Sequence, residues 1–192
     1  MRVFIGMETS GQTREAFRRL GHDAWSCDLL PAQDGSPFHL QGDVFDIVEN
    51  GEPWDLGVFH PTCTFLTNSA AWAFKDPDFA RYPGVGYHQK PKPETLTGAA
   101  RREARELALA DVRRLFALFP TRVKRLAIEN PVGAISNAIE KPAQIIQPYQ
   151  FGDDASKATC LWLRMLPPPN LGAILSAAPG MSNVQDAQCS WH

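Results

Sequence analysis

The chain has 192 residues, 44% apolar and 21% charged, and 19 Lys and Arg against 21 Asp and Glu give a formal net charge of -2. These values are ordinary for a globular protein with a single domain over residues 1–192, and they argue against a dedicated nucleic-acid binder, which usually carries a basic excess. No apolar run approaches the roughly 18–20 residues of a membrane span, and the start MRVFIGMETSG lacks a signal-peptide pattern, so we expect a cytosolic protein without a membrane partner.

The first predicted elements are a strand and a helix. Residues 2–7 (RVFIGM) form an apolar run that predicts a short buried strand, and the turn-rich ETSGQ follows. Residues 12–21 (QTREAFRRLG) predict a helix that ends at Gly21. The side chains expected on its buried face are Ala16, Phe17 and Leu20.

Three further apolar runs predict strands. They are HDAWSCDLLP (22–31), which ends at Asp28 before Pro31, WDLGVFHP (54–61) and RLAIENP (125–131). Between the first two, QGDVFDIV carries an acid, Asp43, directly after Gly42.

A long irregular segment separates the last two of these strands. Residues 75–98 are rich in Pro and Gly, which predicts a long loop of the kind that often forms a lid. A helix over about 100–119 follows, with an apolar stripe of Ala104, Ala108, Val112, Leu115, Phe116 and Phe119. Residues 101–125 hold eight basic and three acidic side chains. We interpret this basic stretch as a solvated helix face. The alternative is that it binds a nucleic-acid strand.

The C-terminal part predicts two more strands, QIIQPYQFG (144–152) and ATCLWLRML (158–166), whereas the tail over 170–192 is assigned to no element. Strands that alternate with helices predict an α/β fold with a mainly parallel sheet and helices on both faces. In such sheets, ligands bind beyond the carboxyl ends of the strands. The residues expected there are Gly6 to Gly11, Asp28, Asp43, His60 to Cys63, and Glu129 to Pro131.

Four cysteines are present: Cys27, Cys63, Cys160 and Cys189. None forms a C-x-x-C pair, and no histidine lies at zinc-finger spacing, so we expect free thiols and no metal site. Cys27 and Cys160 are predicted to be core residues. Cys63 differs, because it follows a strand end and a proline.

Cys63 and Glu129 lie at the ends of successive predicted strands, and this pair of groups suits one reaction. Carbon 5 of a pyrimidine is a poor nucleophile, but addition of a thiolate to carbon 6 lets it attack an electrophilic methyl group. A thiolate is strongly nucleophilic near neutral pH and also leaves again. A carboxyl group at the N3 edge offsets the charge that develops during addition.

The turn after the first strand favours a nucleotide-like ligand. Small residues let the backbone approach a ligand, and the N-terminus of a helix is electropositive. Asp28, after the second strand, suits ribose hydroxyls. Because GMETSG is not G-x-G-x-x-G, an ordinary strand–helix turn is the alternative.

With these motifs in this order, the chain resembles the catalytic domain of the C5-cytosine methyltransferases, and most of all the compact phage- and prophage-type proteins called DNA cytosine methyltransferase. The matching segments are FIGMETSGQTREAFRRLGHDAWSCDLLP, GDVFDI, DLGVFHPTCTFLTNSA, AIENPVG and KPAQIIQPYQFGDDASKATCLWLRMLPPP. The resemblance implies a Rossmann-like class I methyltransferase fold and S-adenosylmethionine as cofactor. For a phage-encoded protein it also implies a place in the bacterial host cytoplasm.

The resemblance further implies roles for single residues. Cys63 would be the nucleophile at carbon 6, and Glu129 would contact N3 and the exocyclic amine. The residues expected to bind the cofactor are Gly6, Glu8, Ser10, Gly11, Asp28 (ribose), Asp43 (adenine edge) and Pro61 (between cofactor and base). The residues expected to bind or position the substrate are His60, Asn68, Ser69, Asn130, Pro131 and Lys157. Asn68 and Ser69 are also expected to cap a helix that directs its electropositive end at Cys63.

The chain departs from the family in the cofactor loop, in the loop of the nucleophile and in the parts that would recognise the acceptor. Glu8 is inserted in the cofactor loop, Thr62 replaces the more usual Pro before Cys63, and the family's Gln-Arg-Arg-x-Arg stretch is missing. The 63 residues after Glu129 leave no room for a target-recognition domain. Flipping a base out of DNA costs a few kcal/mol, so we expect a free cytosine nucleotide such as dCMP as the acceptor, ahead of duplex DNA.

Three other readings of the sequence stay open. The protein would be a DNA cytosine C5-methyltransferase if a partner supplied target recognition. An exocyclic-amine methyltransferase is a second reading, although His-Pro-Thr-Cys lacks the aromatic residue expected to stack on the base. The third is a non-catalytic nucleotide- or cofactor-binding module on the same fold. Trp72 and Tyr82 are expected to pack rather than stack on a ligand.

Overall fold

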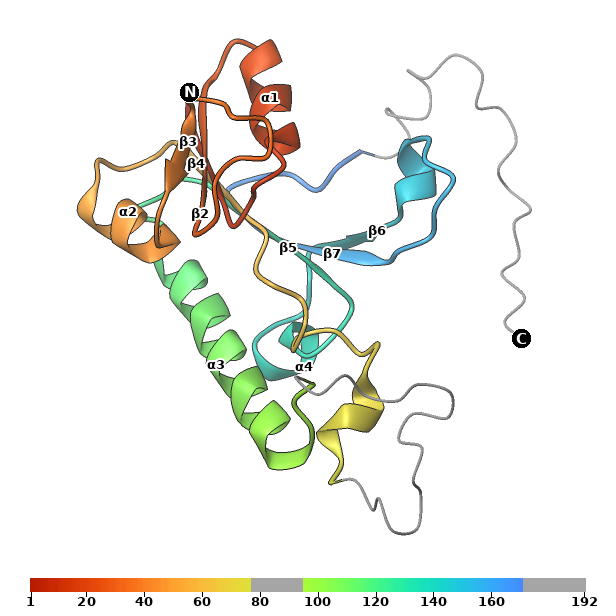
Figure 1. Cartoon of the computed structure of the whole chain (residues 1–192). Coiled ribbons are helices and arrows are strands. Elements are labelled where there is room, and N and C mark those ends of the chain that lie inside the picture. Colours follow the sequence, from red (N-terminus) through yellow and green to blue (C-terminus); the bar gives the residue numbers. More distant parts are fainter. Residues whose placement is uncertain (77–94, 171–192) are drawn as a thin grey trace.

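The computed structural model of the chain describes residues 1–76 and 95–170 (Figure 1). Most of the predicted loop over 75–98, with Tyr82, lies outside the described residues, as do Cys189 and all but the first residue of the tail over 170–192. Among the described helices, none is long and apolar enough to cross a membrane.

The centre of the described structure is a seven-stranded sheet with the order β3-β2-β1-β4-β5-β7-β6. The strands are β1 (Arg2–Gly6), β2 (Asp23–Asp28), β3 (His39–Gln41), β4 (Leu56–Phe59), β5 (Leu126–Pro131), β6 (Gln144–Ile146) and β7 (Thr159–Arg164). β3, β2, β1, β4 and β5 run parallel, whereas β7 is antiparallel to both β5 and β6. The predicted α/β fold with a mainly parallel sheet is therefore confirmed.

Helices pack on both faces of the sheet. They are α1 (Gln12–Arg19), α2 (Val44–Asn50), α3 (Gly98–Ala117) and α4 (Ile135–Ala138), with the short 3-10 helices η1 (Ala71–Phe74) and η2 (Pro148–Phe151). Successive side chains of a strand point to opposite faces, and in β1 this separates Phe4 from Val3 and Ile5. Phe4 belongs to a large cluster with residues of α2, α3 and α4, whereas Val3 and Ile5 contact Phe17 of α1.

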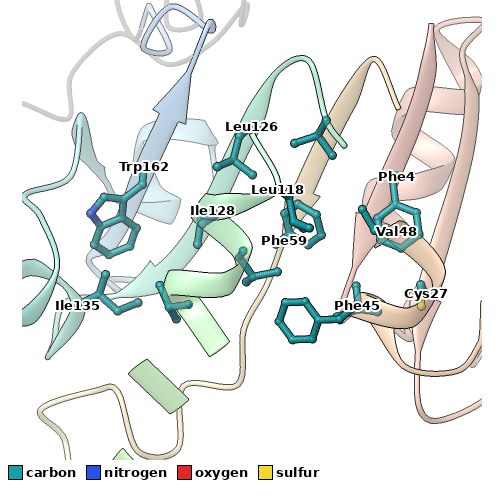
Figure 2. Packing of buried hydrophobic residues seen from close by; sticks show 14 of the residues in the cluster. Phe4, Cys27, Phe45, Val48, Phe59, Leu118, Leu126, Ile128, Ile135 and Trp162 are labelled. Atoms are coloured by element: carbon teal, nitrogen blue, oxygen red, sulfur yellow. The ribbon is translucent and has the colours of Figure 1, made fainter. Parts of the chain in front are cut away.

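Figure 2 shows the larger cluster, in which Phe4, Phe59, Ile128 and Trp162 come from four different strands. These side chains are fully buried. Central parallel strands are covered on both faces and therefore carry nearly continuous apolar runs. This explains why the apolar runs of the sequence predict β1, β2, β4 and β5 correctly.

The buried face of α1 differs from the prediction. Ala16 is exposed and Leu20, just after the helix, is 73% exposed, whereas Arg14 is fully buried. The Arg14 guanidinium donates to Ser26 Oγ at 2.7 Å and is paired with Asp34. Hydrogen bonds to distant parts of the chain allow this charge to be buried.

The predicted face of α3 is also partly wrong. Its fully buried apolar residues are Leu109, Val112 and Leu115, and Leu109 was absent from the predicted stripe. The interpretation of residues 101–125 as a solvated face fails at Arg101, which is only 6% exposed, and at Arg105, which is half-buried. Both arginines point toward the loop that follows β4, as their hydrogen bonds show below.

One predicted strand is shorter than expected. Of residues 144–152, only Gln144–Ile146 form a strand, and η2 follows. Pro148 cannot donate to a ladder, and the side chains of Gln147 and Gln150 form a capping box that starts the helical turn. The elements β3 and α2, which flank Asp43, had no counterpart in the sequence prediction.

Candidate functional site

The candidate site lies where the strand order reverses. The chain passes from β1 to β2 and β3 on one side, and then returns to place β4 and β5 on the other side. In open α/β sheets, ligands bind at such a reversal, outside the carboxyl ends of the strands. Gly6 ends β1 and Phe59 ends β4, so the neighbouring residues Met7 and His60 begin the loops at this point.

A cleft of about 360 Å³ opens at this reversal, within the size range of small-molecule sites. Strand ends contribute Met7, Asp28 and Pro61 to its lining, and the helix faces contribute Phe45, Asp111 and Arg114. Three carboxylates therefore face the cleft, because Asp43 also lines it. Among the described residues of the lining, the single cation is Arg114, which forms a two-bond ion pair with Glu49, both bonds at 2.7 Å.

Asp28 and Asp43 each use one carboxylate oxygen within the protein. Asp43 caps α2, since its Oδ1 accepts from the backbone N–H of Phe45 at 2.7 Å and of Asp46 at 3.2 Å. Asp28 Oδ1 accepts from the backbone N–H of Leu30 at 3.0 Å. The second oxygen of each has no donor among the described residues, so both can accept hydrogen bonds from hydroxyl or amino groups of a ligand.

The turn between β1 and α1 contributes less to the cleft than predicted. Of its residues, Met7 lines the cleft, whereas Gly6, Glu8, Ser10 and Gly11 do not. Glu8 is 8% exposed, and its Oε1 accepts from Ser10 Oγ at 3.0 Å and from the backbone N–H of Thr13 at 2.9 Å. Glu8 therefore occupies the N-terminal end of α1 that was expected to meet a ligand, and the cofactor role of this turn stays a prediction.

Two side-chain contacts join the end of β4 to the end of β5. His60 Nδ1 lies 3.1 Å from Glu129 Oε2. Next to this contact, the buried Asn130 donates from Nδ2 to the carbonyl oxygen of Pro61 at 2.6 Å. Because β4 and β5 pair in parallel with Phe59 opposite Ile128, the sheet itself brings these residues together.

Cys63 lies in an irregular loop that is held at several points; we refer to residues 60–67 as the Cys63 loop. The carbonyl oxygen of Cys63 accepts from the backbone N–H groups of Leu66 and Thr67, each at 3.0 Å. The backbone N–H of Ala134 donates to Leu66 O at 2.7 Å. Gly133 pairs with Thr67 in an isolated bridge, and a Cβ at Gly133 would overlap Leu66 O. The turn after β5 therefore fits against this loop without a side chain.

Two arginines of α3 hold the other side of the Cys63 loop. Arg101 donates to Thr64 O at 3.0 Å, and Arg105 donates from Nε to Phe65 O at 2.7 Å. Figure 1 shows α3 extending from the region of η1 to that of α2. The loop is thus fixed between α3 and the turn after β5.

The expectation that Asn68 and Ser69 cap a helix is wrong. The helical turn that follows is the 3-10 helix η1, which begins after Ala70 and has no side-chain cap. Asn68 and Ser69 are exposed. No capped α-helix directs its N-terminus at Cys63 from this segment.

The described cysteines differ in their surroundings. Cys27 and Cys160 are fully buried, as predicted, whereas Cys63 is partly exposed. Burial, and then the carboxylates of Asp28 and Asp43, raise the pKa of the Cys27 thiol to about 12. Burial also raises the pKa of Cys160. Of these three thiols, Cys63 is the one that an external ligand can reach.

Lys157 is exposed and lies in the loop between η2 and β7. Thr159, two residues further on, pairs with Pro131 at the end of β5. The register therefore places this loop at the same edge of the sheet as Glu129, but no side-chain contact joins Lys157 to the other predicted residues within the described structure.

Sequence reasoning missed several groups at this edge. They are the contact between His60 and Glu129, the arginines Arg101 and Arg105 behind the Cys63 loop, and the α3 residues Asp111 and Arg114 in the cleft. His60 was proposed only as a substrate contact, and its partner lies 69 residues away. For Asp111 and Arg114, their place on the helix predicted over about 100–119 gave no sign that they would line the cleft.

Comparison with protein-family models finds none that matches the chain, and comparison with curated proteins finds no match either. The strongest description of the site therefore comes from its geometry. An acidic cleft lies at the reversal of strand order, and Pro61 in its lining is bonded to Asn130, next to the Glu129 that contacts His60.

Proposed function

We propose that the protein is an S-adenosylmethionine-dependent methyltransferase that acts on carbon 5 of cytosine, with a free cytosine nucleotide such as dCMP as the acceptor. One observation carries the proposal. The loop with the partly exposed Cys63 and the strand end with Glu129 are joined by the contacts of His60 and Asn130, directly beside the cleft at the strand reversal. The observed strand order, with β7 antiparallel between β5 and β6, supports a methyltransferase-like form of the α/β fold.

The cleft suits a cofactor that is rich in donors and positively charged. Asp28, Asp43 and Asp111 accept from hydroxyl and amino groups and favour a cation, and Met7 and Phe45 offer apolar surface. A phosphate group would be repelled by these carboxylates, since the guanidinium of Arg114 is already paired with Glu49. These features fit a nucleoside with a sulfonium centre better than a dinucleotide.

In the proposed reaction, Cys63 acts as the nucleophile and Glu129 as the proton donor. S-adenosylmethionine, when bound, supplies the electrophilic methyl group. The Cys63 thiolate adds to carbon 6 of the ring, and the electron pair moves toward N3, where Glu129 supplies a proton. Carbon 5 becomes nucleophilic and takes the methyl group. Solvent water takes the proton from carbon 5 as the Cys63 thiolate departs, and N3 returns its proton to Glu129, which restores the aromatic ring.

The arginines of residues 101–125 support the free nucleotide as acceptor. Six of the eight basic side chains already form hydrogen bonds inside the protein: Arg101, Arg102, Arg105, Arg114, Arg122 and Lys124. Side chains that bind backbone carbonyls or carboxylates are not free to bind phosphates. The basic stretch therefore has far fewer free basic side chains for contacts with DNA phosphates than its composition suggests.

Intact-protein mass spectrometry tests the proposal. The protein is incubated with S-adenosylmethionine and, separately, with 5-fluoro-dCMP or with duplex DNA that contains 5-fluorocytosine. Fluorine at carbon 5 prevents the final elimination, so a C5 enzyme remains bonded to its substrate. We expect an adduct at Cys63 with the nucleotide and none with the Cys63→Ser variant.

The other outcomes separate the alternatives. An adduct with DNA alone would identify a DNA methyltransferase whose target recognition comes from a partner. Binding of S-adenosylmethionine without an adduct to either acceptor would contradict the Cys63 mechanism and favour a non-catalytic binding module.

A further inference from the structure

The contact between His60 and Glu129 has the geometry of a hydrogen bond from imidazole to carboxylate. Nδ1 and Oε2 are 3.1 Å apart, and the two side chains are 28% and 29% exposed. With the acid proton of Glu129 on Oε1, Oε2 is an acceptor, as both oxygens are in the ionised form, so the ring form with hydrogen on Nδ1 satisfies the contact. Among the described residues, no lysine or arginine is paired with Glu129, and His60 is its one cationic or donor partner.

This contact leaves the two oxygens of Glu129 in different situations. Oε2 is occupied by His60, whereas Oε1 has no protein partner within the described structure and is not buried. On the other side of the ring, His60 Nε2 is buried and also lacks a partner. A buried polar atom without a partner costs free energy and is uncommon in native proteins, which is consistent with a ring held here for function.

We infer that His60 is the positioning residue for Glu129 in the proposed reaction: its Nδ1–H holds Oε2, so that Oε1 meets N3 of the pyrimidine. This inference rests on the proposed function. Lys157, the residue first considered for a contact near the base, is exposed and does not reach Glu129. His60, one residue before Pro61 and three before Cys63, links the carboxyl group to the loop that carries the nucleophile.

The charge balance of the addition step explains why this bond matters. When Cys63 Sγ bonds to carbon 6, an electron pair moves to N3, and the proton on Oε1 passes to N3. Glu129 is then ionised, and its bond from His60 becomes charge-assisted, roughly twice as strong as a neutral one. An interaction that is stronger in the transition state than in the ground state raises the maximal rate and leaves substrate affinity nearly unchanged.

The test measures how fast the full-length protein forms its covalent adduct over a range of 5-fluoro-dCMP concentrations with saturating S-adenosylmethionine. His60→Phe keeps a ring but removes the donor, and we expect a maximal rate about 10- to 100-fold lower, with the half-saturating concentration changed less than about threefold. His60→Asn places an amide N–H near the position of Nδ1. It should recover the rate to within about fivefold of the natural protein.

Two further variants make the comparison specific. His22, a half-buried histidine whose ring lies 6.0 Å from that of Phe17 on α1 in a tilted arrangement, provides the control, since His22→Phe should leave the adduct rate unchanged. His60→Gln carries its donor further from the backbone, so it should not restore the rate. If His60→Phe fails to fold, the contrast between Asn and Gln at position 60 decides the question.

Each result has one meaning. Equal maximal rates for His60→Phe and the natural protein would overturn the role of His60 while the proposed function stands. A change in half-saturation alone would overturn it as well, because it would indicate substrate binding. No adduct with the natural protein would overturn the proposed function and, with it, the role of His60 in the reaction.

Discussion

At the scale of single residues, the surroundings of each sulfur decide its reactivity. A thiolate, not a thiol, is the nucleophile. With a pKa of about 12, the Cys27 thiol is almost entirely protonated near pH 8, and the Cys160 thiol is shifted in the same direction. Both are also closed to solvent, whereas Cys63 is partly exposed.

Alkylation of the folded protein with iodoacetamide at pH 8 should therefore modify Cys63 at least about tenfold faster than Cys27 or Cys160. Peptide mapping by mass spectrometry gives the rate at each position. In concentrated guanidinium chloride the three rates should become similar. Fast labelling of Cys27 or Cys160 in the folded state would show that the core opens more readily than its packing implies.

Asn130 offers a second test at this scale. Its side chain is 1% exposed and donates to the carbonyl oxygen of Pro61 at 2.6 Å. Asn130→Ala leaves that carbonyl without its partner, so the free energy of unfolding should fall by about 1–3 kcal/mol. Urea unfolding measures the change. Asn137→Ala, at an exposed asparagine bonded to Lys141, should change it by less than about 0.5 kcal/mol.

At the scale of elements, α3 and the Cys63 loop behave as one unit. Arg101 and Arg105 donate to three successive parts of the loop backbone, at Thr64, Phe65 and Thr67. Guanidinium groups form strong bonds to oxygen because they are charged. The helix therefore sets the position of the loop, even though the two are separated by more than thirty residues of sequence.

Replacement of Arg105 by Ala should loosen the loop without unfolding the protein. Hydrogen exchange at the amides of Leu66 and Thr67, which bond to Cys63 O, should become about tenfold faster. Arg113→Ala, at an exposed arginine on the same helix, provides the control and should leave these rates unchanged. If Arg105→Ala exchanges like the natural protein, Arg101 and the turn after β5 hold the loop without Arg105.

At the scale of the whole molecule, the two edges of the sheet differ in role. The carboxyl edge holds the cleft and the Cys63 loop, whereas the opposite edge carries a network of hydrogen bonds around Asp55. There Asp55 accepts from the backbone N–H of Arg2 at 2.9 Å and from Lys124 Nζ at 2.8 Å. These bonds tie the starts of β1 and β4 to the segment before β5, and they lower the pKa of Asp55 to about 2, with Lys124 as the main cause.

The direction of the pH effect follows from this lowered pKa. The stabilisation by ionised Asp55 is present above the unfolded-state pKa of about 4 and disappears as pH falls toward about 2. Asp55→Asn should therefore reduce stability at pH 7 by less than about 1 kcal/mol, because Lys124 is largely exposed. The difference should shrink as pH falls from about 4 through about 2, because Asp55 is then protonated in the folded state as well. Urea unfolding of both proteins from pH 7 to pH 2 checks this, with the exposed Asp154→Asn as the control.

The features of this structure that the sequence predicts are those that depend on residues close together in the chain. Continuous apolar runs predict four of the five parallel strands, because strands covered on both faces need them. The order of residues at strand ends also predicts which side chains meet at one edge. Local patterns have no means to predict that Arg14 is buried, since its partners Ser26 and Asp34 lie 12 and 20 residues away.

The same limit applies to the site. Cys63, Glu129 and Asp28 were found from their places at strand ends, and the structure puts all three at the carboxyl edge. The contact of His60 with Glu129 and the arginines behind the loop depend on how strands and helices pack. Asn68 and Ser69 were assigned to a helix cap from local preference, and the irregular path of the chain there removes that role.

The place of β7 in the sheet has a consequence for synthesis of the protein. β7 is the last described strand, yet it lies between β5 and β6 and pairs with β5 along six residues. Domains emerge from the ribosome with the N-terminus first. Nascent chains that stop before Thr159 leave β5 with a bare edge and uncover the surface beneath Trp162, which is fully buried in the folded chain. Bare strand edges promote aggregation, so a premature stop codon there would yield insoluble product or a chaperone client, not a smaller folded protein.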